Sequence, residues 1–184
     1  MKVNAVVTLL ISTITLVFGC VPPNCGNIVD CGSCGNACCK LQFYFKGATE
    51  EEVAQDLYDV LKVGGPDQLY QMQETFTGEL GLADYRERDG LANFVGQTTH
   101  RNEDGNGYVD LINFSINPWY GTGTMVNMFS LTTVGGLYCD EGSNFMNIKN
   151  LMDAMTLPSV MTHIDESCFE MPGAAQYHGL TLDG

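Results

Sequence analysis

The chain has 184 residues, of which 45% are apolar and 16% are charged. This length and balance predict one domain with a packed core, and they argue against wholesale disorder and against multidomain architectures. The 22 acidic side chains outnumber the 8 lysines and arginines and give a net charge of -14, which argues against nucleic acid and anionic lipid as partners, because both require clustered cations.

The N-terminus has the pattern of a secretory signal peptide. Lys2 precedes an apolar run from Ala5 to Phe18, and Gly19 supplies a small residue before a cleavage site at Cys20. The alternatives are a retained membrane anchor and a bacterial lipoprotein, but the run is shorter than the about 20 apolar residues that span a bilayer. We therefore predict a signal peptide over residues 1–19 and a secreted or cell-surface protein with no membrane span in the mature chain.

Eight cysteines remain after this cleavage, and an even number in an exported chain predicts a disulfide framework. They are Cys20, Cys25, Cys31, Cys34, Cys38, Cys39, Cys139 and Cys168. Six of them lie in a Cys-rich N-terminal segment, residues 20–40, so the remaining two, Cys139 and Cys168, are expected to pair with each other. The spacing of Cys31 and Cys34 also fits a redox pair or part of a zinc site, but neither the surrounding glycines nor an oxidising compartment favours these alternatives.

The first elements after the cysteines have clear signals. Leu41, Phe43 and Phe45 alternate with polar residues and predict a half-buried strand. Thr49 and Glu52 form a capping box, which predicts a helix that continues to residue 61 and is stopped by the Gly-Gly-Pro sequence at 64–66.

The rest of the domain reads as strands followed by one helix. The expected elements are a strand over 69–76, a loop over 78–90, a strand over 93–100, a strand over 112–116 ended by Pro118, a returning hairpin strand over 125–134, and a helix from about 145 to 155 capped by Ser143 or Asn144. No strong period follows residue 157. This order predicts a two-layer α+β domain over 41–157, with a largely antiparallel sheet covered by two helices, and a C-terminal tail over 158–184.

The segment from Asn102 to Asn113 resembles the calcium loop of an EF-hand. The candidate ligands are Asn102, Asp104, Asn106, the carbonyl of Tyr108, and Asp110. The loop has Asn at its first and last positions where an EF-hand has Asp and Glu, and the residues after it alternate like a strand. A turn leading into a strand is therefore the favoured interpretation, and any calcium site is expected to be weak. No other cofactor is expected.

A second candidate site lies where the predicted hairpin gives way to the last helix. Gly142 can adopt a positive φ, Asp140 can accept backbone N–H groups, and Asn144 can cap the helix. Ser130 lies on the preceding strand. These residues serve a turn in the simplest interpretation, and Ser130, Asp140 and Asn144 are the candidates for a ligand or hydrolase site at this junction.

The same passage resembles a known family. Its residues Ser130, Gly135, Asp140, Gly142, Asn144 and Ile148 are similar to the C-terminal signature of the domain of unknown function family numbered 1499. The sequence Gly-Tyr-Val-Asp at 107–110 resembles the strand that precedes this signature, and the Cys-rich entry at 34–40 resembles secreted protist and algal versions. The resemblance implies a small α+β domain with no assigned activity and no catalytic residues.

Three hypotheses follow from these observations. The first is an acidic, disulfide-stabilised, non-enzymatic protein that binds an unknown extracellular partner or forms part of an extracellular layer. The second is weak calcium binding through the loop at 102–113. The third is a hydrolase or small-ligand carrier with its site at the strand-to-helix junction.

Overall fold

The computed structural model describes residues 36–75, 80–87, 92–102, 107–137, 140–164 and 168. The predicted signal peptide and five of the predicted disulfide cysteines, Cys20, Cys25, Cys31, Cys34 and Cys139, lie outside the described residues.

The described residues form a seven-stranded antiparallel sheet with two helices, which confirms the predicted α+β class. The elements are β1 (Cys38–Lys46), α1 (Glu50–Leu61), β2 (Tyr70–Met72), β3 (Leu82–Asp84), β4 (Phe94–Arg101), β5 (Val109–Trp119), β6 (Gly123–Thr132), α2 (Ser143–Asp153) and β7 (Val160–Ile164). The strand order is β2-β4-β5-β6-β1-β7, and β3 pairs with the same strand, β4, as β2 does. Strand β6 thus pairs with β1, the first of the described strands in chain order.

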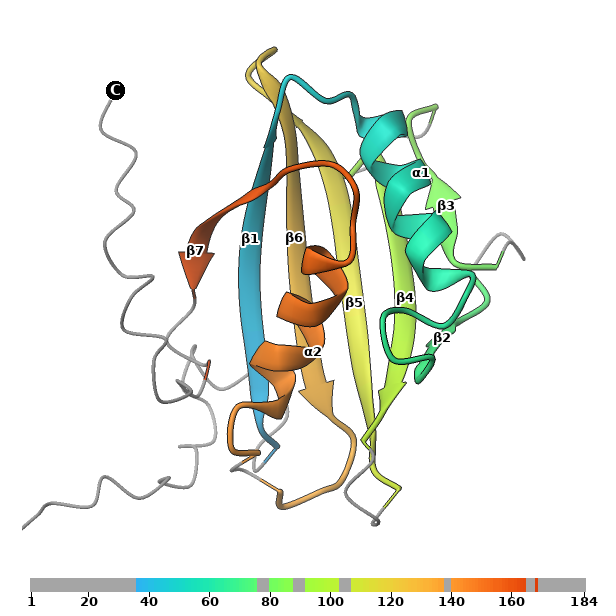
Figure 1. Cartoon of the computed structure of the whole chain (residues 1–184), viewed down its shortest axis with the longest axis vertical. Helices are drawn as coiled ribbons and strands as arrows, with labels where there is room; N and C mark the ends of the chain where they lie inside the picture. Colours follow the sequence, from blue (N-terminus) through green and yellow to red (C-terminus); the bar gives the residue numbers. More distant parts are fainter. Residues whose placement is uncertain are drawn as a thin grey trace, which may run out of the picture.

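Both helices lie on one face of this sheet (Figure 1). Helix α1 contacts β2, β4, β5 and β6, and α2 contacts β6 and β1. Alternate residues of the strands supply the apolar surface beneath them, as in β1, where Leu41, Phe43 and Phe45 are buried. Because the helices cover only this face, the opposite face of the sheet, here called the open face, carries the other half of each strand's side chains.

The predicted capping box of α1 is present. The Glu52 N–H donates to Thr49 Oγ1 at 3.2 Å, and the Thr49 N–H donates to Glu52 Oε2 at 2.9 Å. The helix ends at Leu61, and Gly64 and Gly65 both have a positive φ in the turn that follows. The local signals therefore determine both ends of this helix.

The beginning of α2 differs from its prediction, because neither Ser143 nor Asn144 caps it. Its N-cap is Gly142, which has a φ of 87° and no side chain to accept a bond. The carboxylate of Asp140 takes this role from two residues further back, accepting from the N–H of Gly142 at 3.1 Å and of Asn144 at 2.7 Å. The predicted positive φ of Gly142 and the predicted role of Asp140 are both confirmed.

Three strand predictions need correction. The predicted loop at 78–90 contains β3, which is too short to show a period. Strand β5 does not end before Pro118 but continues to Trp119, with Pro118 opposite Thr124. Strand β7, in the segment without a sequence period, pairs with the outer side of β1 and extends the sheet.

The predicted disulfide between Cys139 and Cys168 is wrong. Cys168 is bonded to Cys39 on β1, which is 129 residues away in the sequence. Cys38 is also disulfide-bonded, so none of the described cysteines is a free thiol. The prediction failed because it treated the N-terminal cysteines as a closed set, whereas Cys39 faces the core at the start of a central strand.

Within the described residues, no helix is both long and apolar enough to span a membrane.

Candidate functional site

A row of polar side chains crosses the helix-covered face at one end of the sheet. Tyr70, His100, Asp110 and Thr132 are successive cross-strand partners on β2, β4, β5 and β6, and all four are buried. Helix α2 lies over this row. Buried polar groups need hydrogen-bond partners, and two asparagines of α2, Asn144 and Asn147, supply them to Thr132, Asp110 and Tyr70.

Asn144 connects the predicted junction residues. Ser130 Oγ donates to Asn144 Oδ1 at 2.6 Å, and Asn144 Nδ2 lies 2.9 Å from Thr132 Oγ1, 3.2 Å from the Ala37 carbonyl and 2.6 Å from Asp140 Oδ2. Ser130 is fully buried. The structure thus brings Ser130, Asp140 and Asn144 together, but it commits their polar atoms to one another and to the start of α2.

Asp110, in the same buried row, joins a second group of polar side chains. Its Oδ2 accepts from Asn102 Nδ2 at 2.9 Å and from Asn147 Nδ2 at 2.8 Å, and the residue is fully buried. Asp104 and Asn106, the other side chains of the predicted calcium loop, lie outside the described residues. The calcium site therefore stays a prediction, and within the described residues Asp110 joins β5 to α2.

His100 lies between Asp110 and Tyr70 in the same buried row. Its Nε2 lies 2.9 Å from Asp67 Oδ2, and its ring is 4.4 Å from the ring of Tyr70, centroid to centroid. The Tyr70 hydroxyl donates to the Asn147 carbonyl at 2.7 Å, and burial, reinforced by the charge of Asp67, raises the pKa of this phenol well above its ordinary value. Tyr70 therefore acts as a permanent donor that ties β2 to α2.

Two buried atoms of this row, His100 Nδ1 and Asp110 Oδ1, have no hydrogen-bond partner among the described residues. They belong to cross-strand partners whose side chains point to the same face. An internal water bridging the two strands would satisfy both atoms.

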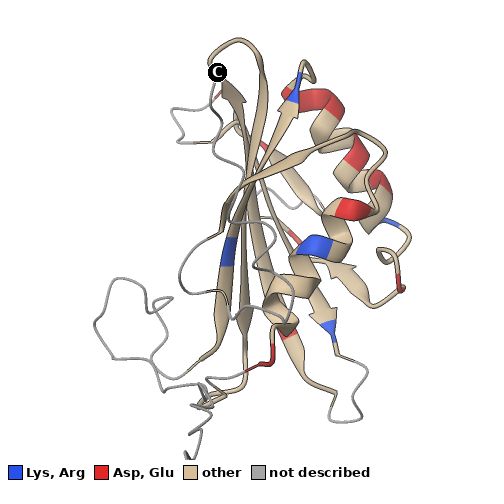
Figure 2. Cartoon of the chain, turned by 60° about the vertical axis from the view of Figure 1, so that its left-hand side comes forward, with Lys and Arg blue, Asp and Glu red and all other residues tan. Residues whose placement is uncertain are grey.

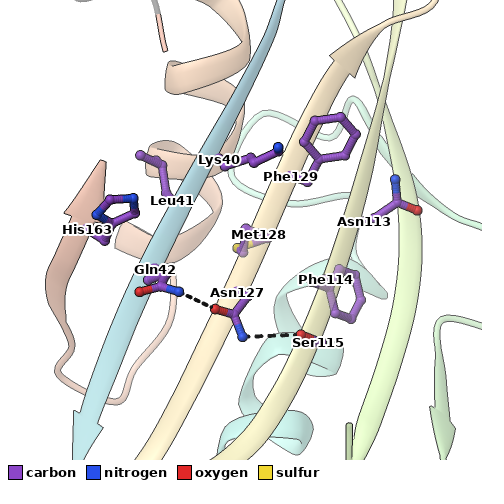
Figure 3. A pocket seen from close by; sticks show the side chains of 10 residues that line it. All are labelled: Lys40, Leu41, Gln42, Asn113, Phe114, Ser115, Asn127, Met128, Phe129 and His163. Atoms are coloured by element: carbon purple, nitrogen blue, oxygen red, sulfur yellow. Dashed lines mark hydrogen bonds between the residues drawn. The ribbon is translucent and has the colours of Figure 1, made fainter. Parts of the chain in front are cut away.

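The open face presents a different chemistry. Six half-buried polar or aromatic side chains gather on the central strands, and they are Gln42, Gln97, Asn113, Ser115, Asn127 and Phe129. All but Gln97 line a cavity of about 400 Å³, together with Lys40 and His163 (Figure 3). A second cavity of about 440 Å³ includes Gln97 and shares Asn113 with the first. The two cavities are therefore neighbours on one surface.

Amide groups of the open face are held by one another. Gln97 Nε2 donates to Asn113 Oδ1 at 2.7 Å, and Gln42 Nε2 donates to Asn127 Oδ1 at 2.8 Å. Asn127 Nδ2 continues this second row toward Ser115 Oγ, at 3.4 Å. An amide has two N–H donors and a carbonyl with two lone pairs, so these contacts orient each group and leave capacity for a ligand.

The β5–β6 hairpin ends in two exposed aromatic residues, Trp119 and Tyr120, which are 39% and 85% exposed. Tyr120 and Gly121 both have a positive φ, and the Thr122 N–H donates to the Trp119 carbonyl at 2.9 Å, as in a type I′ turn. The rings of Trp119 and Tyr120 meet edge to face with centroids 4.6 Å apart. Strand alternation places Trp119 on the same side of β5 as Asn113 and Ser115.

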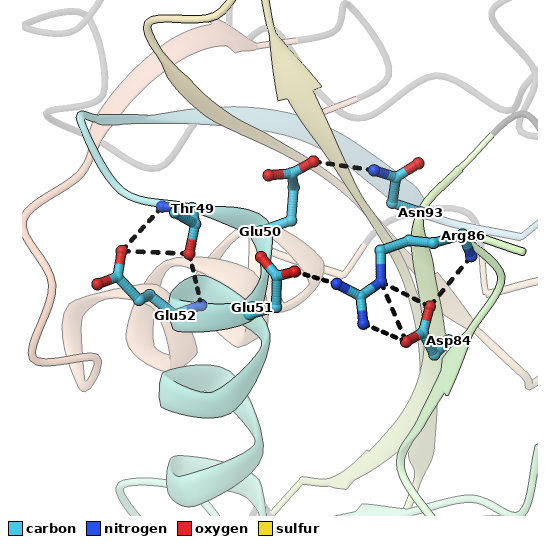
Figure 4. A network of polar contacts seen from close by, with 7 residues as sticks. All are labelled: Thr49, Glu50, Glu51, Glu52, Asp84, Arg86 and Asn93. Carbon is cyan, nitrogen blue, oxygen red and sulfur yellow. Dashed lines mark hydrogen bonds and ion pairs between the residues drawn. The ribbon is translucent and has the colours of Figure 1, made fainter.

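A third cavity, of about 410 Å³, lies between α1 and the β3–β4 edge. Arg86 lines it and pairs with Asp84 and Glu51 (Figure 4). Its guanidinium lies 4.8 Å from the centre of the Phe94 ring. The hydrogen bonds from Arg86 hold the pKa of Asp84 below its usual range. The one cation of this cavity is therefore already committed to its two carboxylates, Glu51 and Asp84.

Charge is distributed unevenly over the molecule. Figure 2 shows acidic residues along α1, whereas the chain between Asp110 and Asp140 contains no charged residue. This neutral stretch includes the hairpin tip and the middle of the open face. In a protein with a net charge of -14, these strands add no charge of their own to repel or attract a ligand.

The sequence predicts the strand at 112–116 but not the amide partners of Asn113 on β4 or the amide row of β1 and β6, because only the register of the sheet brings these side chains together. No three His, Cys, Asp or Glu side chains among the described residues are arranged to hold a metal ion. Comparison with family models, with curated proteins and with solved structures finds no significant match. The resemblance to family 1499 accordingly stays a prediction.

Proposed function

We propose that this chain is a secreted or cell-surface protein that binds an extracellular ligand on the open face of its sheet and performs no catalysis. The observation that carries this proposal is the pair of neighbouring cavities on the face that the helices leave uncovered, with oriented amide groups between them. Concave sites with a few placed polar groups are the usual form of ligand sites in proteins.

The contacts of Ser130 support a binding role over the hydrolase alternative. Its hydroxyl donates to the amide oxygen of Asn144 and is fully buried, so among the described residues it has neither a hydrogen-bonded base to take its proton nor an opening to a substrate. Neither open-face cavity is lined by Ser130, Asp140 or Asn144. The three residues are better explained as the polar attachment of α2 to the sheet.

A thermal-shift screen of the mature protein tests the proposal. The screen compares the wild-type protein with a variant carrying Asn113→Ala and Asn127→Ala, using neutral oligosaccharides, short peptides, phosphorylated metabolites and divalent cations. A ligand present at 100 times its Kd stabilises the folded state by about 2.7 kcal/mol, so its melting shift is measurable. We expect the shift to disappear in the double variant.

Gln55→Ala provides the matched control, because it removes an exposed amide on α1 whose side chain bonds only to Asp59 among the described residues. This variant should keep the ligand-induced shift. A ligand that stabilises the wild type and the double variant equally would place its site elsewhere and would contradict the proposal.

Calcium binding at 102–113 is a separate proposal with its own test. Calorimetry at millimolar calcium should give a heat of binding that Asp104→Ala abolishes, since Asp104 supplies a carboxylate that the buried Asp110 does not replace. Equal heats from the two proteins would exclude this loop as the site.

A further inference from the structure

We infer that the ligand of the open face is an uncharged glycan chain, bound from the amide cavity to the aromatic hairpin tip. This inference rests on the proposed function and adds the class of ligand. Three independent features carry it: the neutrality of the surface, the pairing of amides with aromatic rings, and the conformation of Tyr120.

The low charge of the two central strands makes the common charged ligands a poor fit to this face. No charged residue occurs between Asp110 and Asp140, and the whole chain carries a net charge of -14. A polyanion would be repelled by this field and would find no cluster of cations, while a polycation would be drawn instead to the carboxylates of α1. The two cavities have one charged lining residue of each sign: Lys40 in the first, with its ammonium 5.7 Å from the centre of the Phe129 ring, and Glu74 in the second.

The side chains of the face suit a sugar. Each hydroxyl of a sugar both donates and accepts, and an amide such as Asn113 or Gln42 offers both functions from a fixed position. The C–H faces of sugar rings are apolar and pack on aromatic rings, for which Phe129 and Trp119 are available. Trp119 lies six residues along β5 from Asn113, which is about 20 Å at about 3.4 Å per residue. The surface is therefore long enough for several sugar units.

Tyr120 indicates that the aromatic tip is selected for contact. A positive φ is unfavourable for a residue with a large side chain, and Asn or Gly normally occupies this position of a type I′ turn. Tyr120 is also 85% exposed, so its side chain gains little from packing in return. Strain of this kind is found where a side chain serves function, and an exposed Trp–Tyr pair is suited to stacking on a ligand.

Calorimetry with the mature protein tests this inference. The probes are the neutral hexasaccharides of β-1,4-glucose, β-1,3-glucose, β-1,4-N-acetylglucosamine and β-1,4-mannose, with the matching disaccharides, a heparin hexasaccharide and an uncharged Gly/Ser/Asn peptide. We expect at least one neutral hexasaccharide to bind, at least about tenfold more tightly than its disaccharide, and with an affinity that does not change between 50 mM and 500 mM salt.

Trp119→Ala should weaken this binding about tenfold by removing a ring from the far end of the site. Val63→Ala is the matched control, because it removes an exposed apolar side chain at the end of α1, away from the open face. Melting temperatures of both variants establish that they are folded.

The outcomes separate the two proposals. Binding of the peptide or of heparin alone, lost with Asn113→Ala and Asn127→Ala, would overturn the glycan inference and leave the open-face function standing. Binding of a neutral hexasaccharide that none of these substitutions affects would overturn both. Failure of every neutral hexasaccharide to bind at millimolar concentration would overturn the glycan inference.

Discussion

Asp110 and Asn144 are the residues on which the attachment of α2 depends. Each lies in a buried position between a strand of the sheet and the helix, and each satisfies several polar groups at once. Removal of either side chain would leave its partners buried without hydrogen bonds, which costs more than the bonds themselves contribute. The fold explains the contacts of both residues without any ligand.

Asp110→Ala should lower the free energy of unfolding by about 3 kcal/mol, because the amides of Asn102 and Asn147 lose their shared acceptor. Asp110→Asn should cost clearly less, since its carbonyl oxygen can still accept from both amides and its new N–H group can donate toward the otherwise unpartnered His100 Nδ1. Urea denaturation measures both variants. Equal losses for Ala and Asn would show that the carboxylate charge itself is needed.

Tyr120 should display a conflict between stability and binding. Tyr120→Asn places a residue that tolerates a positive φ before Gly121 and should raise the free energy of unfolding by about 1 kcal/mol. If the hairpin tip contacts the ligand, the same substitution should weaken binding. Thermal melting and calorimetry on one preparation measure the two effects. A variant that is more stable and binds as well as the wild type would remove Tyr120 from the ligand site.

At the scale of elements, Arg86 links α1 to β3. It pairs with Glu51 on the first turn of the helix and with Asp84 at the end of the strand, and it covers the ring of Phe94 on β4. These groups are largely exposed, so the pairs contribute little and are screened by salt. The pairs of Arg86 help to hold β3, a strand of three residues, against α1.

The Asp84 pair should make a small part of the stability depend on pH. Because the pKa of Asp84 is lower in the folded state than its unfolded value of 3.8, its contribution is present above that value and is lost as the pH falls through the lower, folded pKa. The melting temperature of Asp84→Asn should therefore lie below that of the wild type at pH 7, and the gap should narrow toward pH 3. Glu87→Gln, an exposed neighbour, controls for net charge. A gap that stays constant with pH would exclude the pair as its cause.

Local patterns predicted those elements whose signals lie within their own sequence. The alternation of Leu41, Phe43 and Phe45 and the capping box at Thr49 gave the correct strand and helix, because period and cap are short-range properties. Strand β3 has only three residues and exists because β4 offers it a free edge beyond β2. Strand β7 likewise follows from the outer edge of β1 rather than from a period.

The candidate sites also differ in whether local sequence could predict them. The junction of Asp140 and Gly142 could be predicted because turn chemistry is local. The open-face rows could not, because Gln97, Asn113 and Asn127 come from three strands and meet only through the antiparallel register. The aromatic tip was hidden by Pro118, which marks a strand end in most sequences but here occupies a paired position next to Trp119.

At the scale of the whole molecule, the first and last strands of the sheet are neighbours, and the Cys39–Cys168 disulfide links the same two regions covalently. Among the described residues, β7 is otherwise attached by its edge pairing with β1 and by the packing of Met161 and Ile164 against the core. A cross-link between residues this far apart restricts the unfolded chain strongly, and it also keeps β7 in place as the sheet edge beside the first cavity, which His163 lines.

Replacing both Cys39 and Cys168 by Ala should lower the free energy of unfolding by up to about 5 kcal/mol, the loop-entropy value for a separation of 129 residues. Hydrogen exchange should be faster in β7 than in the β4–β5–β6 centre of the sheet, because within the described residues β7 pairs with a strand on one side only. Tandem mass spectrometry of the unreduced protein identifies the pairing directly. Recovery of a linked Cys139–Cys168 peptide would contradict the Cys39–Cys168 pairing. Equal exchange rates in β7 and in the centre of the sheet would show that β7 is held by contacts other than this disulfide.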